Sequence, residues 1–599
     1  MTGRRRSIVP QVRSSSQRLA SALTEKRFLV FLLIMFIVMA VWVETLPYDP
    51  MNGDIADATT NAIWTEYYKE GKVAVTYEEW KSDNRPNTQS VVVELNGKAY
   101  VVNEKGPAHA VFTMVFGSLT GTLFAGIATI STYMLGRRVF NWKVGAISSL
   151  LVLTNLTLVT MWYKDYWVDA STPHLLILGI WLFVESGLRM KSFLDGKGRK
   201  ALLLSVVMGI GGGVAFGTAI ATRYTVAVVI IPAIIYIFAI FGKVIVHSLK
   251  ERDIKAFGKT FAHMTLYFLP FFLGLMMVVV PLMNYNITYF GGPFQSGYDA
   301  TSLMDYERTH QSLDPRNQTD FLSTDPMGKV ENIAHNAVVL APVVLLRMLC
   351  LLFVPVAMWK LWKRPVFWLL FIWGLLIMLG FYSMDWVDKY AQIPATPWEP
   401  RYQLPALPPF ALLGGYGLYA LGKAISIKIE RTKDGFVGPF FVIAVTGLLI
   451  FANLGFVSMY FKDVHDGKNT GAPNPGGPPG GPGGQGQEPV FTIQKIYNDG
   501  KDNLRKAVQL QHCTVSSFQK GPDGQVIRFN ITDSSGPRSM LVLLHDFPPG
   551  TAPNIQTGMK VTVVGLFDWM DFNKNGIIDE GEPAMNVKYG TPDRIIIEN

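Results

Sequence analysis

Apolar residues gather along this chain in blocks about 20 residues long, and short polar segments separate the blocks. A helix needs about 20 apolar residues to cross a hydrocarbon core roughly 30 Å thick, so these blocks predict membrane-spanning helices. The predicted fold is an α-helical polytopic membrane protein with about 11 transmembrane helices. They lie at roughly 27–46, 112–135, 142–161, 173–188, 201–221, 225–245, 262–284, 340–359, 365–383, 405–422 and 436–460.

The pattern changes after the last apolar block. Residues 461–490 are rich in Gly and Pro, which is typical of an extended tether. Residues 491–599 alternate apolar and polar positions in short runs, which predicts strands. The candidate strands resemble a small all-β OB-fold barrel, and they lie at Val508–Phe518, Val526–Thr532, Met540–His545, Lys560–Phe567 and Arg594–Ile597.

The distribution of charge predicts an orientation. Charged residues make up 17% of the chain, against about 25% in soluble domains, and the net charge is +9. Lys and Arg lie in the N-terminal tail (1–26) and in every second loop, such as 189–200 and 250–259, whereas the alternate short loops hold few. The positive-inside rule therefore puts the N-terminus in the cytoplasm and the C-terminal domain outside a plasma membrane. Residues 28–43 lack a following cleavage site and are expected to stay as the first span.

Long outer loops are where a protein of this kind is expected to carry chemistry. The loop at 47–110 contains Asn52-Gly53-Asp54, with Asp57 three residues further on and on the same face if the segment is helical. Asp54 is a candidate general base, because a low-dielectric membrane surface raises the pKa of a carboxyl group. The alternative is that Asp54 is an exposed N-cap. Later in the loop, Asn96-Gly97 between two β-branched runs predicts a hairpin.

Several motifs, read in order, resemble the GT-C superfamily of membrane glycosyltransferases, and in particular the branch of protein O-mannosyltransferases and aminoarabinose transferases. The first-loop Asp54 matches the position of that branch's catalytic acid. The other motifs are Glu104-Lys105-Gly106-Pro107, Leu135-Gly136-Arg137-Arg138, Asn284-Tyr285, Ser296-Gly297-Tyr298 and Arg401-Tyr402-Gln403-Leu404-Pro405. The similarity covers about 27–460. It departs from the branch at Ile55, where an acid is usual, and at Gly106, where proline is usual.

The resemblance implies transfer of a sugar from a polyprenyl-phosphate carrier to an acceptor outside the cytoplasm, in an inverting reaction. It also implies a second outer acid at Asp165 or Asp169, and a divalent metal at Glu104. Asp57, Asp165 and Asp169 are candidates for holding the acceptor or supporting the base. A solvated loop acid is the alternative for Glu104, and an N-cap is the alternative for Asp169.

Three cations at predicted outer ends of spans are candidates for binding the donor phosphate: Lys105, Arg223 and Arg401. Charge developing on a leaving phosphate requires fixed positive partners. Arg223 lies between two apolar spans, which is a costly place for a charge without a role. The alternatives are that Lys105 and Arg223 snorkel to the headgroups and that Arg401 pairs with Glu399.

The C-terminal domain contains a calcium-loop pattern at 571–582. Oxygen ligands are expected at positions 1, 3, 5, 7, 9 and 12, with Gly at position 6. The residues at the ligand positions are Asp571, Asn573, Asn575, Ile577 (through its carbonyl oxygen), Asp579 and Glu582. From Phe491 onward we count 11 Lys and Arg against 12 Asp and Glu, a net charge of −1, so a nucleic-acid partner is rejected.

The predicted function is a membrane glycosyltransferase that uses a polyprenyl-phosphate-linked sugar, has Asp54 as its base and modifies a glycan, lipid or protein acceptor. A transporter or flippase of lipid-linked precursors is the alternative. Such a protein needs no catalytic acid and usually has breaks in its spans, for which Gly209–Gly213 is the main candidate. A surface anchor whose tail carries the function is a third hypothesis.

Overall fold

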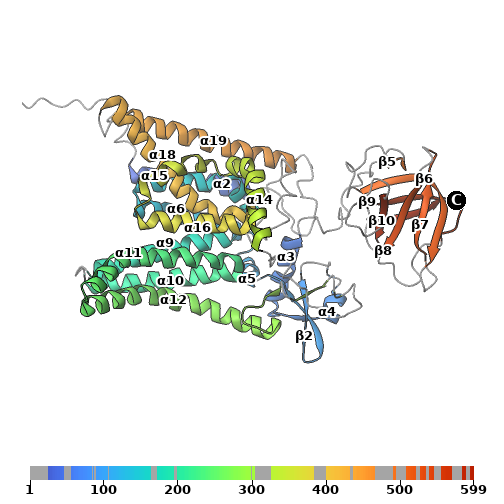
Figure 1. Cartoon of the computed structure of the whole chain (residues 1–599), viewed down its shortest axis with the longest axis horizontal. Coiled ribbons are helices and arrows are strands. Elements are labelled where there is room, and N and C mark those ends of the chain that lie inside the picture. The colour runs from blue at the N-terminus through green and yellow to red at the C-terminus, as the bar shows by residue number, and fades with distance from the viewer. Residues whose placement is uncertain are drawn as a thin grey trace, which may run out of the picture. The chain divides into compact units, whose positions relative to one another are not determined.

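The computed structural model divides the chain into two units, 1–470 and 471–599, and each is described by itself (Figure 1). The residues that the structure describes are 24–45, 56–83, 85, 90–105, 107–163, 171–194, 198–297, 300–303, 306, 326–383, 399–431, 436–465, 490–493, 507–520, 526–534, 539–545, 555–569, 583–588 and 594–598.

The first unit is mainly helical. Its α-helices are α2 (Glu25–Glu44), α3 (Ala56–Lys69), α4 (Tyr77–Ser82), α5 (Ala108–Phe116), α6 (Leu119–Val139), α7 (Trp142–Leu153), α8 (Leu156–Tyr163), α9 (Thr172–Leu194), α10 (Arg199–Thr222), α11 (Ile230–Lys250), α12 (Ile254–Phe290), α14 (Pro326–Arg347), α15 (Val354–Leu361), α16 (Pro365–Tyr382), α18 (Leu407–Glu430) and α19 (Val437–His465). Three 3-10 helices join them: η2 (Tyr224–Val229), η5 (Leu349–Phe353) and η6 (Glu399–Ala406).

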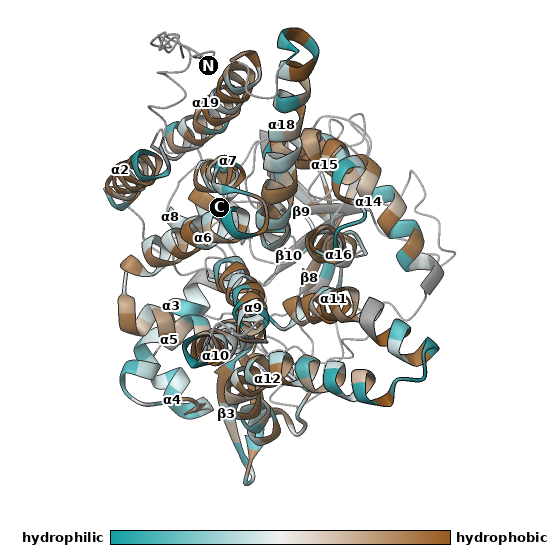
Figure 2. Cartoon of the chain, turned by 90° about the vertical axis from the view of Figure 1, so that its left-hand side faces the viewer, coloured by the Kyte–Doolittle hydropathy of each residue, from teal (hydrophilic) through white to brown (hydrophobic). Residues whose placement is uncertain are grey.

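Among the described residues, nine helices are long and apolar enough to cross a membrane, and ten are if α7 and α8, which meet at a bend of 54°, count together as one span. Large apolar side chains stay exposed along α2, α12 and α19, and Figure 2 shows brown segments on these helices. Such surfaces suit a lipid environment, where apolar side chains face hydrocarbon. The predicted helical membrane fold is confirmed.

Several predicted spans differ in their bounds, and two of the differences concern helices α12 and α14. The span predicted at 262–284 is part of the 37-residue α12, which includes the preceding basic segment. The span predicted at 340–359 is interrupted at Met348, between α14 and η5. The Asn155 side-chain amide donates to the Arg347 carbonyl at 2.6 Å and so satisfies a carbonyl at the end of α14.

Helices α9, α10 and α12 pack closely because glycines remove side-chain bulk where they meet. A Cβ added at Gly213 would lie 2.0 Å from the Phe271 carbonyl oxygen, and one at Gly274 would lie 2.1 Å from the Ile210 carbonyl oxygen. Helix α10 runs unbroken through Gly209–Gly213. The glycine run is therefore a packing face, and the proposed break in this span is wrong.

A four-stranded sheet covers one end of these helices, and we call this end the hairpin end. Its strand order is β1 (Val75–Thr76), β3 (Lys98–Asn103), β2 (Ser90–Leu95), β4 (Thr301–Ser302). Asn96 and Gly97 both have positive φ, at 53° and 73°, as a type I′ turn requires. The predicted hairpin is present, and β2 contacts α12 (Figure 1).

The second unit is a β-domain. Its strands are β5 (Val490–Phe491), β6 (Ala507–Lys520), β7 (Val526–Thr532), β8 (Ser539–His545), β9 (Lys560–Trp569), β10 (Pro583–Lys588) and β11 (Arg594–Glu598). All five predicted strands are present, and β5 and β10 were missed. Five strands form a closed ring in the order β6-β7-β8-β10-β9, because β9 pairs back with β6. The ring surrounds an apolar core that includes Leu510, Phe529 and Val563.

Candidate active site at the hairpin end

A rigid aromatic core positions the hairpin against the helices. Trp64 and Tyr67 of α3 pack with Trp80 of α4, and the Trp64 indole nitrogen donates to the Ser90 hydroxyl at 3.1 Å. The Thr65 hydroxyl donates to the Ala110 carbonyl at 3.4 Å, which ties α3 to α5. The segment that follows Asp54 in sequence is thus held against the start of α5.

The strand β3 ends in three polar residues, Asn103, Glu104 and Lys105. Asn103 is fully buried, and its side-chain oxygen accepts from the Lys105 backbone amide at 3.0 Å. Glu104 is 5% exposed. A Cβ at Gly297 would lie 2.4 Å from the Glu104 carbonyl oxygen, so the backbone at Gly297 lies directly against Glu104. Two of the motifs that carry the family resemblance therefore touch.

A chain of buried hydrogen bonds links α5 to α9 and α9 to α10. The His109 Nδ1 and the Ser171 hydroxyl oxygen lie 3.0 Å apart, and the hydroxyls of Thr172 and Thr222 lie 2.9 Å apart. Arg223 follows Thr222 directly, with an extended backbone (φ −154°) that ends α10 and begins η2. The start of α9 and the end of α10 therefore meet at the hairpin end, where Arg223 lies.

Tyrosines connect Arg223 with the end of β3. The Tyr224 hydroxyl donates to the Asn286 side-chain oxygen at 3.2 Å, and the Asn286 amide nitrogen donates to the Pro293 carbonyl at 3.3 Å. Tyr224 and Tyr289 lie near Tyr68 of α3, and burial raises the pKa of Tyr68 above its ordinary value. Tyr68 therefore stays a neutral hydroxyl between β3 and η2.

Several buried polar atoms at this end make no hydrogen bond of ordinary geometry with any residue that the structure describes, and three of them matter most here. They are the Asn103 amide nitrogen and the hydroxyl oxygens of Tyr68 and Tyr285. The Tyr68 hydroxyl lies beside the Asn103 side chain. A buried donor without a partner costs about 1–3 kcal/mol, and a ligand with acceptor oxygens would recover that cost.

The structure places some of the predicted site residues at this end. Glu104, Lys105 and Arg223 lie there. The backbone of Arg401 lies in η6, which contacts α8 and α9, and Asp57 lies in the first turn of α3. Asp54, Asp165, Asp169 and the calcium loop 571–582 fall outside the described residues. Their roles stay predictions.

The sequence did not predict the tyrosine and asparagine side chains that gather at the hairpin end, which are Tyr68, Asn103, Tyr224, Tyr285 and Asn286. Asn284-Tyr285-Asn286 was identified as part of a motif without a role for its members. Tyr68 and Asn103 gave no signal, because a tyrosine in an aromatic helix and an asparagine at a strand end are ordinary there.

A divalent metal at Glu104 would need further ligands nearby. Within the described ranges, no group of three or more His, Cys, Asp or Glu side chains is arranged to hold a metal ion. The described side chains therefore form no metal site at Glu104, and its role as a metal ligand stays a prediction.

No protein-family model and no curated protein matches this chain. Among solved structures, ArnT from Cupriavidus metallidurans bound to undecaprenyl phosphate matches with 14% identity and a TM-score of 0.34, over 74% of this chain and 72% of ArnT. The archaeal oligosaccharyltransferase AglB from Archaeoglobus fulgidus, in complex with an inhibitory peptide and a dolichol-phosphate, matches with 11% identity and a TM-score of 0.41, over 85% of this chain and 75% of AglB. These low values leave the function to be argued from this chain's own residues.

Proposed function

We propose that this chain is a membrane glycosyltransferase that takes a sugar from a polyprenyl-phosphate carrier. The observation that carries the proposal is a set of polar atoms at the hairpin end that are buried without an ordinary hydrogen bond to the described residues, at the same end as Glu104, Lys105 and Arg223. A phosphate ester offers acceptor oxygens to Asn103, Tyr68 and Tyr285 and negative charge to the two cations. An apolar carrier chain could lie along the lipid-facing helices.

The proposed reaction is a single displacement. An acceptor hydroxyl oxygen attacks the anomeric carbon, and the bond between that carbon and the phosphate oxygen breaks. The polyprenyl phosphate leaves with the electron pair, and the hydroxyl proton passes to the Asp54 carboxylate. Lys105, Arg223 and Arg401 would stabilise the charge that develops on the phosphate, since such fixed charges are strongest where water is excluded.

Supporting roles are proposed for the other acids. Asp57, Asp165 or Asp169 would orient the acceptor or hold Asp54 in place. Ser171, two residues after Asp169, is buried against His109, so the segment that follows these acids is anchored at the hairpin end. This anchoring supports a place for them in the site.

The structure does not support the main argument for the flippase hypothesis, which was a break in the span at Gly209–Gly213. Helix α10 is continuous there and packs against α9 and α12. A helix locked by backbone contact through Gly213 is poorly suited to rearrange during lipid transport. The enzyme proposal requires no such rearrangement.

The test is transfer of radiolabelled sugar in membranes from a panel of polyprenyl-phosphate donors, with wild type, Asp54→Asn and Glu94→Gln compared at equal expression. Glu94 is an exposed acid on the same hairpin and serves as the matched control. Loss of a general base lowers rate by about 10²–10⁴-fold, so Asp54→Asn should abolish transfer and Glu94→Gln should keep it. Transfer by neither wild type nor control, or equal transfer by all three proteins, would contradict the proposal.

We also propose that the β-domain is OB-like and binds calcium through 571–582. The ring order β6-β7-β8-β10-β9 supports the OB-like topology, and the loop lies between β9 and β10. Titration of the full chain with calcium should show one site with a dissociation constant of about 10⁻⁴–10⁻³ M. Glu582→Gln should remove it and Asp523→Asn should not; unchanged binding in Glu582→Gln would contradict the assignment.

A further inference from the structure

The end of the helices opposite the hairpin end carries a second polar site, which we call the arginine end. Helix α6 ends there with Arg137 and Arg138, about 30 Å from its first residue by helix rise. Helix α9 reaches the same end with Glu185 and Arg189, and α10 begins there. A pocket of about 400 Å³ opens between these helices, lined by Met134, Arg137, Arg138, Trp181, Glu185, Arg189 and Met208.

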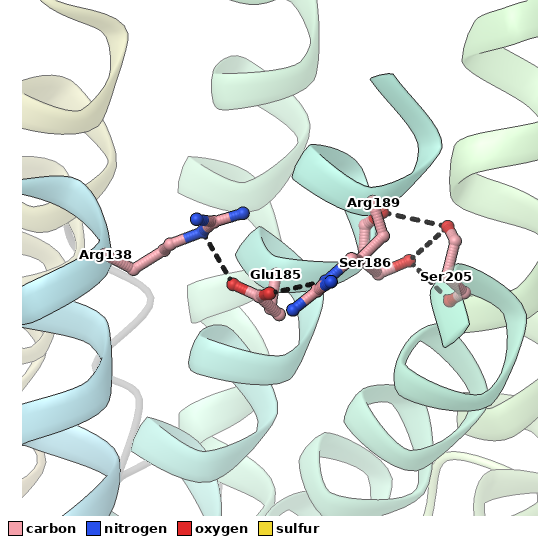
Figure 3. Close-up of polar contacts among 5 residues, drawn as sticks. All are labelled: Arg138, Glu185, Ser186, Arg189 and Ser205. Carbon is pink, nitrogen blue, oxygen red and sulfur yellow. Dashed lines mark hydrogen bonds and ion pairs between the residues drawn. The ribbon is translucent and has the colours of Figure 1, made fainter. Parts of the chain in front are cut away.

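One buried carboxylate orients two of the guanidinium groups. Glu185 has a side chain that is only 9% exposed, and its two oxygens accept from the Nε atoms of Arg138 and Arg189, each at 2.8 Å (Figure 3). Arg137 pairs with Glu25 of α2 at 2.6 Å. The four charged residues that line the pocket therefore carry a net charge of +2.

The wall of the pocket is rigid. Ser186 and Ser205 exchange hydrogen bonds, each hydroxyl donating to the other's carbonyl at 2.8 Å, and so fix α9 against α10 beside Glu185 (Figure 3). Arg138 and Arg189 keep about 40% of their side-chain surface exposed, so their remaining N–H groups are open to a ligand. A guanidinium fixed through Nε presents its Nη groups in the planar fork that matches phosphate oxygens.

We propose that this pocket binds the phosphate group of an anionic membrane lipid. Its position at a helix-bundle end, its excess positive charge and its apolar walls (Met134, Trp181 and Met208) fit a headgroup whose glycerol and acyl parts lie against the helices. Basic residues that only snorkel would not need a buried, doubly paired Glu185 between them. The site is independent of the proposed transferase activity.

The test uses the full chain in nanodiscs of phosphatidylcholine with a minor fraction of phosphatidylglycerol, with bound lipids counted by native mass spectrometry after release. The triple variant R138Q/E185Q/R189Q removes the fork without leaving a buried charge, and it changes the net charge by −1. The single variant Arg364→Gln, outside the pocket, makes the same change in net charge.

We expect the triple variant to retain phosphatidylglycerol about tenfold less than wild type, and Arg364→Gln to retain it normally. Competition with millimolar inorganic phosphate tells a lipid headgroup from free phosphate as the ligand. We expect the inorganic phosphate to displace little of the bound lipid. Equal retention by wild type and the triple variant would overturn the proposal. Binding of free phosphate with no preference for phosphatidylglycerol over phosphatidylcholine would overturn the assignment to a lipid.

Discussion

The two ends of the helix bundle differ in whether their buried polar groups make ordinary hydrogen bonds to the described residues. At the arginine end, the buried carboxylate of Glu185 has both its oxygens paired, and the Ser186 and Ser205 hydroxyls pair with each other's backbone. At the hairpin end, the Asn103 amide nitrogen and the Tyr68 hydroxyl are buried without an ordinary hydrogen bond to the described residues. The buried carboxylate and hydroxyls of the first end pair with protein groups, whereas these buried polar atoms of the second end remain to offer a ligand.

This difference indicates where chemistry takes place. Unsatisfied buried polar atoms cost stability, so a fold that keeps several of them in one place gains something else from them. The arginine end gains a rigid cationic fork from its paired groups. Helices α9 and α10 run between both ends, and their glycine contacts hold the two sites in a fixed relation.

The largest expected effect separates two arginines at opposite ends of α10, Arg223 and Arg199. Arg223→Gln at the hairpin end should lower sugar transfer by about 10²–10³-fold, because a fixed charge opposite the leaving phosphate is lost. Arg199→Gln, at the other end of α10 and exposed, should leave transfer unchanged. The measurement is initial rate in membranes at equal protein. Equal loss in both variants would mean that general charge, not position, supports activity.

Gly213 tests the packing that joins the two ends. Gly213→Ala should lower stability by about 1–3 kcal/mol, because the new Cβ meets the Phe271 carbonyl of α12. Gly211→Ala is the matched control, since its Cβ would meet only Leu182 at 3.6 Å. Thermal unfolding in detergent compares the two variants. A control as destabilised as Gly213→Ala would contradict close α10–α12 contact.

Glu185→Gln should destabilise the protein by about 1–2 kcal/mol, a value reduced because Arg138 and Arg189 are partly exposed to solvent. Sugar transfer should persist, because the change lies at the arginine end. Thermal unfolding and transfer are measured on the same preparation. Lost transfer in a protein of normal stability would show that the two ends are not separate.

The smallest expected effect is the change in stability caused by Tyr67→Phe. The Tyr67 hydroxyl donates to the Asp83 carboxylate at 2.8 Å, and burial together with this bond raises its pKa to about 12. The neutral phenol is favoured in the fold, so its contribution is full below pH 10 and is lost as pH rises from 10 to 12. Tyr67→Phe should cost about 1 kcal/mol at pH 7 and weaken the stability loss above pH 10, as followed by chemical unfolding. If Tyr67→Phe loses as much stability above pH 10 as wild type does, Tyr67 is not the source of that loss.

Local sequence patterns predicted much of the fold but only part of the candidate site. Apolar blocks predicted the helices, and Asn96-Gly97 predicted the hairpin, because both signals depend on neighbouring residues alone. The break at Met348 was missed because it involves Asn155, which lies far away in sequence. Strand β10 was missed for a similar reason, since its pairing with β8 and β9 gives it its place in the ring.

Within the site, charged residues stood out against an apolar background, so Glu104, Lys105 and Arg223 could be predicted from the sequence. Tyr68, Asn103 and Tyr285 could not, because their significance lies in polar atoms that are buried without an ordinary hydrogen bond to the described residues, which only the assembled helices reveal. The role of Gly213 was predicted wrongly for the same reason, since it provides close helix packing and not a break. A glycine in a helix indicates a break or a close contact equally well until the neighbouring Phe271 is known.

The most direct test of the central claim is to find where the carrier phosphate binds. A polyprenyl phosphate with a photoreactive group next to its phosphate would be cross-linked to the full chain in membranes, and the labelled peptides mapped by mass spectrometry. The account predicts labelling around Asn103–Lys105, Arg223 or Tyr285 at the hairpin end. Labelling confined to the arginine end, near Arg138 and Glu185, or no labelling that unlabelled polyprenyl phosphate competes away, would contradict it.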